Sequence, residues 1–390
     1  MKHILMDNNI TNQDNKNVIK FLKKNPRLTN GIEVERFEKK WSQWLGVRYS
    51  VFVNSGSAAN LASMAYLRTI YKDGEIIVPT ITWVSDILSV FYSNFKPTFV
   101  DINLENLAIN EQLLEKAITK KTRAIFLTHV LGLNGLTEKI LNLVKKYNLY
   151  LIEDVCESHG GFYKKKKLGT FGHLSNFSFY YAHHMSTIEG GMICTNNKKI
   201  YESVRIIRGH GLLRESKDKV FKKKMIKKYN YLNKDFLFLY PGYNLRSTEI
   251  NAIYGQSQIK NLDSNNLKRI KNFEIFLNNL DPKKYFVNFD TKGSCNYAFI
   301  ILFNKEYRNL KFRNKFEKIL NKNNIEYRRG LAGGGDQSLH PYMNYFKINV
   351  KKVGSFKNTR IIHNFGYYIG NYPTLKKDKI LRICKILNSV

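Results

Sequence analysis

Two adjacent histidines, His183 and His184, stand between an aromatic run and a pair of glycines. The run over 176–180 is typical of a strand, and 191–195 is typical of a second one. In α/β enzymes a polar loop between strands places reactive side chains at the edge of a sheet. Imidazole has an unperturbed pKa of roughly 6.5, so a histidine at such an edge can act as a general base. A surface turn carrying two solvated histidines accounts for the pattern equally well.

Acidic side chains end an earlier apolar run. The run over 149–153 is expected to be a strand, and Asp154 and Glu157 follow it directly. A buried aspartate at a strand end needs a cationic partner to stay ionised. The pattern therefore indicates that a buried Asp154 would have a cationic partner at this strand end. We interpret the nearby His159 as structural.

Small residues follow the first expected strand, where Ser55, Gly56 and Ser57 open a helix. Small side chains let backbone amides approach a phosphate, and a helix N-terminus favours an anion. An ordinary helix cap is the alternative interpretation. Trp83 follows another strand end, where its flat ring could stack on a ligand. A tryptophan in the hydrophobic core is the alternative.

Strands alternate with helical patterns over the first half of the chain, which favours a mostly parallel sheet with helices on both faces. The expected strands are 50–53, 75–78, 96–100, 123–128, 149–153, 176–180 and 191–195.

The remaining segments predict a second, smaller domain. A helix is expected from Ser247 onward, and we place the domain boundary after it, giving a large domain over 1–262 and a small one over 263–390. Its clearest elements are a strand over 296–303 and a closing helix over 376–387. The basic segment 215–235 has no strong periodicity and is expected to be a connector. We expect it to form a mobile loop near the active site.

Composition narrows the class of protein. The 390 residues are 43% hydrophobic, and the formal net charge is +33. The lysines are scattered and no nucleic-acid-binding motif accompanies them, so a solvated basic surface is favoured over a nucleic-acid partner. No apolar run is long enough to span a membrane, and the polar N-terminus lacks a signal-peptide core, so we expect a cytoplasmic protein. The four cysteines are too widely spaced for a structural metal site.

The spacing of Ser178, His183 and Gly190 resembles the cofactor segment of the DegT/StrS-type sugar aminotransferases. In that family a lysine that binds pyridoxal 5'-phosphate (PLP) stands where this chain has His183. A small branch of the family, the nucleotide-sugar 3-dehydratases, carries histidine there. The resemblance implies the PLP-dependent aspartate-aminotransferase fold (fold type I), with a seven-stranded, mostly parallel large domain and a smaller C-terminal α+β domain.

The resemblance also assigns roles in binding PLP, or its amino form pyridoxamine 5'-phosphate. The phosphate is held at the helix start and by a serine, an aromatic ring stacks on the cofactor, and a carboxylate faces its ring nitrogen with a second one nearby. An asparagine of a Gly-Tyr-Asn-x-Arg segment reaches the phosphate from a neighbouring subunit, which implies a homodimer with shared active sites. The implied cofactor-binding residues are Gly56, Ser57, Trp83, Asp154, Glu157, Ser178 and Asn244.

His210 and Arg214 resemble residues of a substrate-binding loop, although a solvated loop accounts for Arg214 as well. The glycine-rich segment 328–336 is also expected to contribute to substrate binding. No metal site is expected. A related dehydratase of a CDP-linked sugar holds an iron–sulfur cluster on closely grouped cysteines, and this chain has no such group.

The histidine implies the reaction. L-Glutamate would aminate the cofactor, and His183 would then act as the base while a nucleotide-linked 4-keto-6-deoxy sugar loses its 3-hydroxyl. The implied pathway is 3,6-dideoxysugar biosynthesis, as for lipopolysaccharide, and GDP is favoured over CDP or UDP. An aminotransferase-like enzyme that uses His183 differently, or a non-catalytic nucleotide-sugar or nucleic-acid binding protein, remains the alternative.

Overall fold

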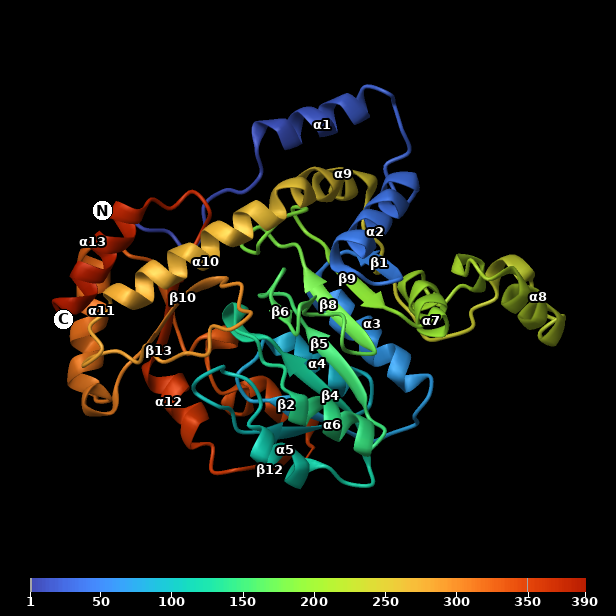
Figure 1. Ribbon diagram of the computed structural model, residues 1–390. Coiled ribbons are helices and arrows are strands. Elements are labelled where there is room, and N and C mark those ends of the chain that lie inside the picture. The colour runs from blue at the N-terminus through green and yellow to red at the C-terminus, as the bar shows by residue number, and fades with distance from the viewer. Residues whose placement is uncertain (1, 349) are drawn as a thin grey trace.

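A large eight-stranded sheet forms the centre of the protein in the computed structural model, which describes residues 2–348 and 350–390 (Figure 1). The strand order is β1-β9-β8-β5-β4-β2-β3-β12. All its neighbouring pairs are parallel except those of β9, which runs antiparallel to β1 and β8. The strands are β1 (Tyr49–Val53), β2 (Glu75–Pro79), β3 (Lys96–Val100), β4 (Thr122–Thr128), β5 (Tyr150–Asp154), β8 (Leu174–Ser178), β9 (Gly191–Thr195) and β12 (Lys351–Val353).

All seven strands expected from the sequence form, each within two residues of its expected bounds, which confirms the fold class. The eighth, β12, was not expected, because three residues carry too weak a pattern. It comes from the C-terminal part of the chain and pairs with β3 at the sheet edge. The division at residue 262 stays a prediction, and β12 shows that the later segment also extends the large sheet.

Helices cover both faces of the large sheet because successive strand residues point to opposite sides. Ile76 and Val78 of β2 pack in one apolar cluster, and Ile77 between them packs in the other. The first cluster includes buried residues of α3 (Gly56–Arg68), α4 (Val84–Tyr92) and α7 (Lys198–Arg208). The second includes α2 (Ile32–Leu45), α5 (Glu111–Ala117), α6 (Glu138–Lys146) and α9 (Glu249–Gln258).

The long helix α10 (Leu262–Asn279) leads from the large sheet to a three-stranded antiparallel sheet (Figure 1). The N-terminal arm packs on this second sheet, where the His3 ring lies 3.0 Å from the Gly370 carbonyl oxygen. The strand order of this second sheet is β10-β13-β11. The elements here are β10 (Ala298–Leu302), α11 (Leu310–Lys322), β11 (Tyr327–Arg329), α12 (Lys357–Phe365), β13 (Gly366–Gly370) and α13 (Lys377–Asn388).

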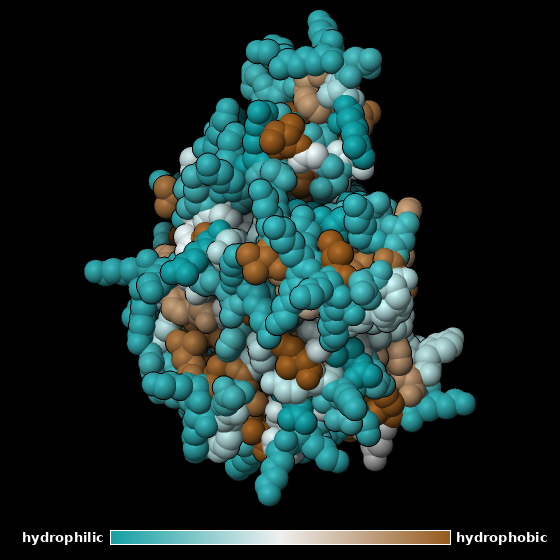
Figure 2. All heavy atoms as spheres, turned by 90° about the vertical axis from the view of Figure 1, so that its right-hand side faces the viewer, coloured by the Kyte–Doolittle hydropathy of each residue, from teal (hydrophilic) through white to brown (hydrophobic). Residues whose placement is uncertain are grey.

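The basic segment 215–235 is not the loop that we expected. It contains the helix α8 (Lys219–Lys228), which begins with Asp218 as its cap, buries none of its side chains and projects from the body (Figure 1). The face of the molecule on this side is mainly hydrophilic, with single apolar side chains among the polar ones (Figure 2). In the described residues, no helix combines the length and apolar character that crossing a membrane requires.

A buried carboxylate joins α2 to α9. Glu249, the first residue of α9, accepts hydrogen bonds from the backbone N–H groups of Gly31, Glu33 and Val34, each at 3.0 Å. These N–H groups lie at the start of α2, where they have no partner within the helix. A negative charge at this helix end is also favoured by the helix dipole. Glu249 thus fixes the start of α2 against the start of α9.

We expect Glu249→Ala to lower the free energy of unfolding by about 3 kcal/mol, because it leaves three buried or partly buried N–H groups without their acceptor. The measurement is urea denaturation. The matched control is Glu138→Ala in the first turn of α6, because the Glu138 side chain is 54% exposed and contacts the side chains of Lys164 and Tyr163 rather than buried backbone N–H groups. An equal loss in both variants would contradict the proposed connection.

Candidate functional site

A cavity of about 440 Å³ opens where the carboxyl ends of the parallel strands meet residues of the second sheet. Ligands of open α/β sheets bind at this edge. The cavity contains polar, acidic and aromatic side chains. It is lined by Leu5, Ser55, Gly56, Ser57, Asn60, Trp83, Ser85, Thr128, Asp154, Cys156, Glu157, Ser178, Tyr180, Tyr181, Ala182, His183, Glu189, Tyr297, Arg328, Gly333 and Tyr368.

One end of the cavity is the N-terminus of α3. Ser55 caps this helix, and its hydroxyl accepts a hydrogen bond from the Ala58 N–H at 3.0 Å. A Cβ atom on Gly56 would lie 2.6 Å from the Ser178 Cβ, so only glycine allows α3 to approach the end of β8. The expected residues Gly56, Ser57 and Ser178 therefore come together at a helix end that suits a phosphate.

Asp154 ends β5 and is 4% exposed. Its carboxylate accepts hydrogen bonds from the Cys156 N–H at 2.9 Å and from Asn60 Nδ2 at 3.1 Å. Among the described residues, no Lys, Arg or His nitrogen lies within 4.0 Å of it. A buried carboxylate without a cation suits a cationic ligand, because the ligand would compensate the charge that burial disfavours.

Glu157 follows one turn later and accepts a hydrogen bond from the Leu131 N–H at 2.7 Å. The pKa of Glu157 is raised to about 7, chiefly by burial; the hydrogen bond from the Leu131 N–H lowers this pKa, and the charge of Asp154 raises it. Its carboxyl can therefore exchange a proton near neutral pH. Glu157 lines the same cavity as Asp154.

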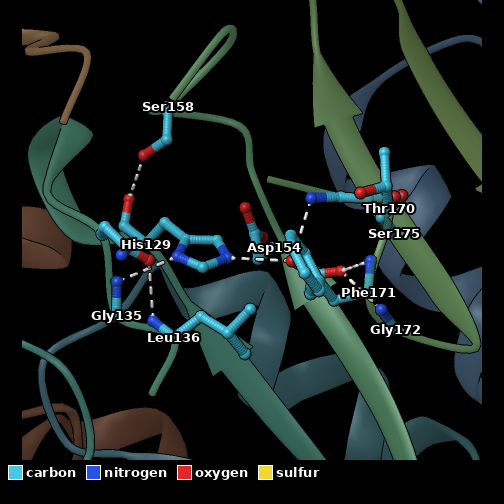
Figure 3. A network of polar contacts seen from close by, with 12 residues as sticks. His129, Gly135, Leu136, Asp154, Ser158, Thr170, Phe171, Gly172 and Ser175 are labelled. Atoms are coloured by element: carbon cyan, nitrogen blue, oxygen red, sulfur yellow. Dashed lines mark hydrogen bonds and ion pairs between the residues drawn. The ribbon is translucent and has the colours of Figure 1, made fainter. Parts of the chain in front are cut away.

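A polar network on the other side of β5 fixes this strand end (Figure 3). Glu153 is fully buried, and its carboxylate accepts three backbone N–H bonds from residues 169–172 at 2.6–2.9 Å. The His129 ring lies 3.3 Å from the same carboxylate. The Ser158 hydroxyl donates to the His129 carbonyl oxygen at 2.7 Å. Because Glu153 and Ser158 flank Asp154, this network restricts where Asp154 can lie.

His183 lies on the loop after β8 and lines the cavity. Its backbone N–H donates to the Tyr180 carbonyl oxygen at 3.0 Å, and its ring lies 5.4 Å from that of Tyr297. Burial lowers the pKa of His183 to about 4, which the charge of Asp154 opposes and that of Arg269 reinforces. The imidazole is therefore neutral at neutral pH and can accept a proton.

His184 is buried and points elsewhere, since its Nε2 lies 3.0 Å from the Cys295 carbonyl oxygen. The ring of His159 stacks on that of His184 with centroids 5.1 Å apart, and it is fully buried. Neither lines the cavity. Two adjacent histidines thus occupy two environments, and His183 alone faces the site.

Trp83 is 54% exposed and lines the cavity, so it is not a core tryptophan. Arg328 and Gly333 of the glycine-rich segment also line it, and Arg328 supplies the only Lys or Arg side chain among the described lining residues. Tyr297 reaches the cavity because its backbone N–H donates to the Leu131 carbonyl oxygen at 3.2 Å.

Three expected site residues lie outside this cavity. Asn244, His210 and Arg214 are all exposed. The His210 ring lies 3.4 Å from Arg246, and the Arg214 guanidinium lies 5.9 Å from the Phe236 ring centroid. Their binding roles stay predictions.

Sequence reasoning missed several lining residues. Asn60 stands one turn after Gly56, and a polar residue in that alanine-rich helix could have signalled the site. Tyr297 and Tyr368 come from the second sheet, and nothing in their local sequence shows that they face β5.

The strand order, the N-terminus of α3 and the buried Asp154 together define an aminotransferase-type fold with a cavity that suits a cofactor. The model of the DegT/DnrJ/EryC1/StrS aminotransferase family matches residues 8–388, so the chain belongs to this family. GDP-4-keto-6-deoxy-D-mannose 3-dehydratase of Escherichia coli O55:H7 is 31% identical over 367 residues, covering 92% of each chain.

Solved structures agree in fold. The E. coli GDP-4-keto-6-deoxy-D-mannose 3-dehydratase with bound hydrated PLP is 28% identical, with a TM-score of 0.90 over 99% of each chain. A GDP-4-keto-6-deoxymannose 3-dehydratase with a trapped PLP-glutamate geminal diamine is 27% identical, with a TM-score of 0.90 over 99% of this chain and 100% of the other.

We expect the His183 imidazole to stay neutral between about pH 6 and pH 8, because its folded pKa lies below that of a free histidine, which is roughly 6.5. NMR titration of the full-length protein with labelled histidine can follow it, with the signal assigned by its loss in His183→Asn. A midpoint near 6.5 for this signal would contradict the burial argument.

Proposed function

We propose that the protein is a PLP-dependent nucleotide-sugar 3-dehydratase, which removes the 3-hydroxyl of a GDP-linked 4-keto-6-deoxy sugar with L-glutamate as amino donor. One observation carries the proposal. His183 faces the cavity at the position expected for the cofactor-binding lysine, and no lysine occurs among the described lining residues. The similarity to the E. coli 3-dehydratases over almost the whole chain supports the same reaction.

The residues present fit PLP. The N-terminus of α3 with Gly56 and Ser57 would hold the phosphate, and Asp154 would face the ring nitrogen. Trp83 would stack on the ring. The lack of a nearby cation at Asp154 and the close approach at Gly56 are the two structural observations behind this assignment. When bound, PLP supplies an electron sink that eases proton removal from an adjacent carbon.

Within this site His183 would move the proton. Its neutral ring would accept a proton from the carbon next to the cofactor ring. The negative charge of Asp154 would hold the ring nitrogen of the cofactor. Tyr180 and Tyr297, whose ring centroids lie 6.3 and 5.4 Å from that of His183, limit where the imidazole can turn. A lysine there would bind the cofactor covalently and favour amine transfer, which histidine cannot do.

The overall reaction balances without another reductant. Glutamate loses two electrons and becomes 2-oxoglutarate, and carbon 3 of the sugar gains two electrons as its hydroxyl leaves. The amino group is released as ammonia. The reaction thus yields a 3-deoxy-4-keto sugar, a precursor for 3,6-dideoxysugar biosynthesis. The proposal places the enzyme in the cytoplasm, where glutamate and nucleotide-activated sugars are available.

We expect His183→Asn to reduce turnover by about 10²–10⁴-fold, because general base catalysis contributes that much. The assay incubates the enzyme with PLP, glutamate and GDP-4-keto-6-deoxymannose and measures ammonia and 2-oxoglutarate. His184→Gln is the matched control, because His184 is buried and bonds to Cys295 rather than facing the cavity. An aminosugar product, or covalent trapping of PLP by borohydride, would support the aminotransferase alternative.

We further propose that the enzyme is a homodimer with shared active sites. Asn244, His210 and Arg214 lie outside their own chain's cavity. Exposed large apolar side chains occur close to them in sequence, and such groups mark protein interfaces. They are Tyr231, Leu232, Phe236, Phe238 and Tyr243.

Mixing His183→Asn with Asn244→Ala chains tests sharing. If Asn244 serves the partner's cavity, each single variant is inactive and the mixed dimer regains one intact site. Activity should therefore rise well above that of either variant after co-expression, and size-exclusion chromatography should report a dimer. No recovery in a confirmed mixed dimer would contradict the sharing.

A further inference from the structure

A second buried carboxylate lies directly behind Asp154. Asp86 of α4 is fully buried and is not among the residues that line the cavity. Asn60 Nδ2 donates to both carboxylates, at 2.6 Å to Asp86 Oδ1 and at 3.1 Å to Asp154 Oδ2. One amide nitrogen thus bridges two carboxyl groups in a site shielded from water.

The number of protons that the contacts of Asp86 require indicates its protonation state. Its Oδ2 is within hydrogen-bonding distance of the Thr82 hydroxyl and lies 2.7 Å from the Thr128 hydroxyl. The two hydroxyl oxygens also lie 2.7 Å from each other. Three oxygens therefore make three mutual contacts, whereas two hydroxyls supply only two protons. A third proton, carried by the Asp86 carboxyl, satisfies every contact.

The charges around Asp86 agree with this count. The ionisable groups that face it are Asp154 of β5, Cys156 after β5 and Tyr342 of the C-terminal part, and each is neutral or negative. Among the described residues, no Lys, Arg or His nitrogen lies within 4.0 Å of Asp86. Burial, and then the charge of Asp154, raises the pKa of Asp86 well above its usual range.

We propose that Asp86 is held as a neutral carboxylic acid, so that the buried pair carries one negative charge, on Asp154 beside the cavity. Two carboxyl groups this close in a dry site cannot both ionise. Asp86 and Asn60 then act as positioning residues that orient the Asp154 carboxylate. The consequence for a cationic cofactor ring rests on the proposed function, whereas the protonation of Asp86 does not.

The variant Asp86→Asn tests this directly, because an amide imitates a neutral acid. Its oxygen can accept from Asn60, and its NH₂ group can donate to Thr82 and Thr128. In the native protein the unfolded chain releases the Asp86 proton above about pH 4, whereas the folded chain retains it, so stability falls as pH rises. We expect a shallower fall in Asp86→Asn.

The experiment is urea unfolding of the full-length protein from about pH 6 to pH 9. Asp86→Asn should match or exceed the native midpoint at the highest pH, and Asp86→Ala should be less stable throughout. The matched control is Asp101→Asn, because buried Asp101 accepts backbone N–H bonds from Ile102 and Thr359 and should lose stability at every pH. An Asp86→Asn protein that loses stability at every pH, as this control does, would overturn the proposal.

An infrared spectrum gives a second, independent readout. The native protein at about pH 9 should show the carbonyl band of a protonated carboxylic acid, which neither solvated carboxyls nor Glu157, whose pKa is about 7, retain at that pH. The band should disappear in Asp86→Asn and remain in Asp101→Asn. Its absence from the native protein would overturn the proposal. Neither readout requires PLP or turnover, so a failure of the proposed function would leave both results interpretable.

Discussion

The buried carboxylate of Asp154 imposes the main constraint on this structure. A charge that burial keeps from water must be compensated by hydrogen bonds or by a cation. Asn60 and the Cys156 N–H supply the hydrogen bonds, and the cavity leaves room for the cation. The turn after β5, the helix α3 that carries Asn60 and the Glu153 network behind the strand all serve to keep this carboxylate in place.

The site gives three ionisable groups, His183, Asp154 and Asp86, three different environments. His183 is neutral because burial disfavours its charge, and the Asp154 carboxylate lines the same cavity. On our proposal, Asp86 keeps a proton that Asp154 lacks. Sites that combine acid and base chemistry commonly push the pKa values of neighbouring groups apart in this way. A neutral histidine and a carboxylate that line one cavity suit proton removal next to a cofactor.

The strand order explains why these groups meet. β8 lies beside β5, so the loop that carries His183 begins next to Asp154 even though 29 positions separate them. Gly56 allows α3 to pack against the end of β8, which brings the N-terminus of α3 to the same cavity. The second sheet closes the cavity with Tyr297, Arg328 and Tyr368.

Much of this could be predicted from the sequence because it depends on local patterns. Apolar runs identified all seven expected strands, and the small residues after β1 and the acidic residues after β5 marked the cavity edge. Residues whose role depends on distant partners could not be found in this way. In the sequence Asp86 is an ordinary helix residue, and only the fold places Thr82, Thr128 and Asn60 around it. The fold likewise directs His184 to the Cys295 carbonyl oxygen and His183 to the cavity. Local sequence determines which strands and turns form, whereas burial and charge compensation depend on atoms that only the folded chain brings together.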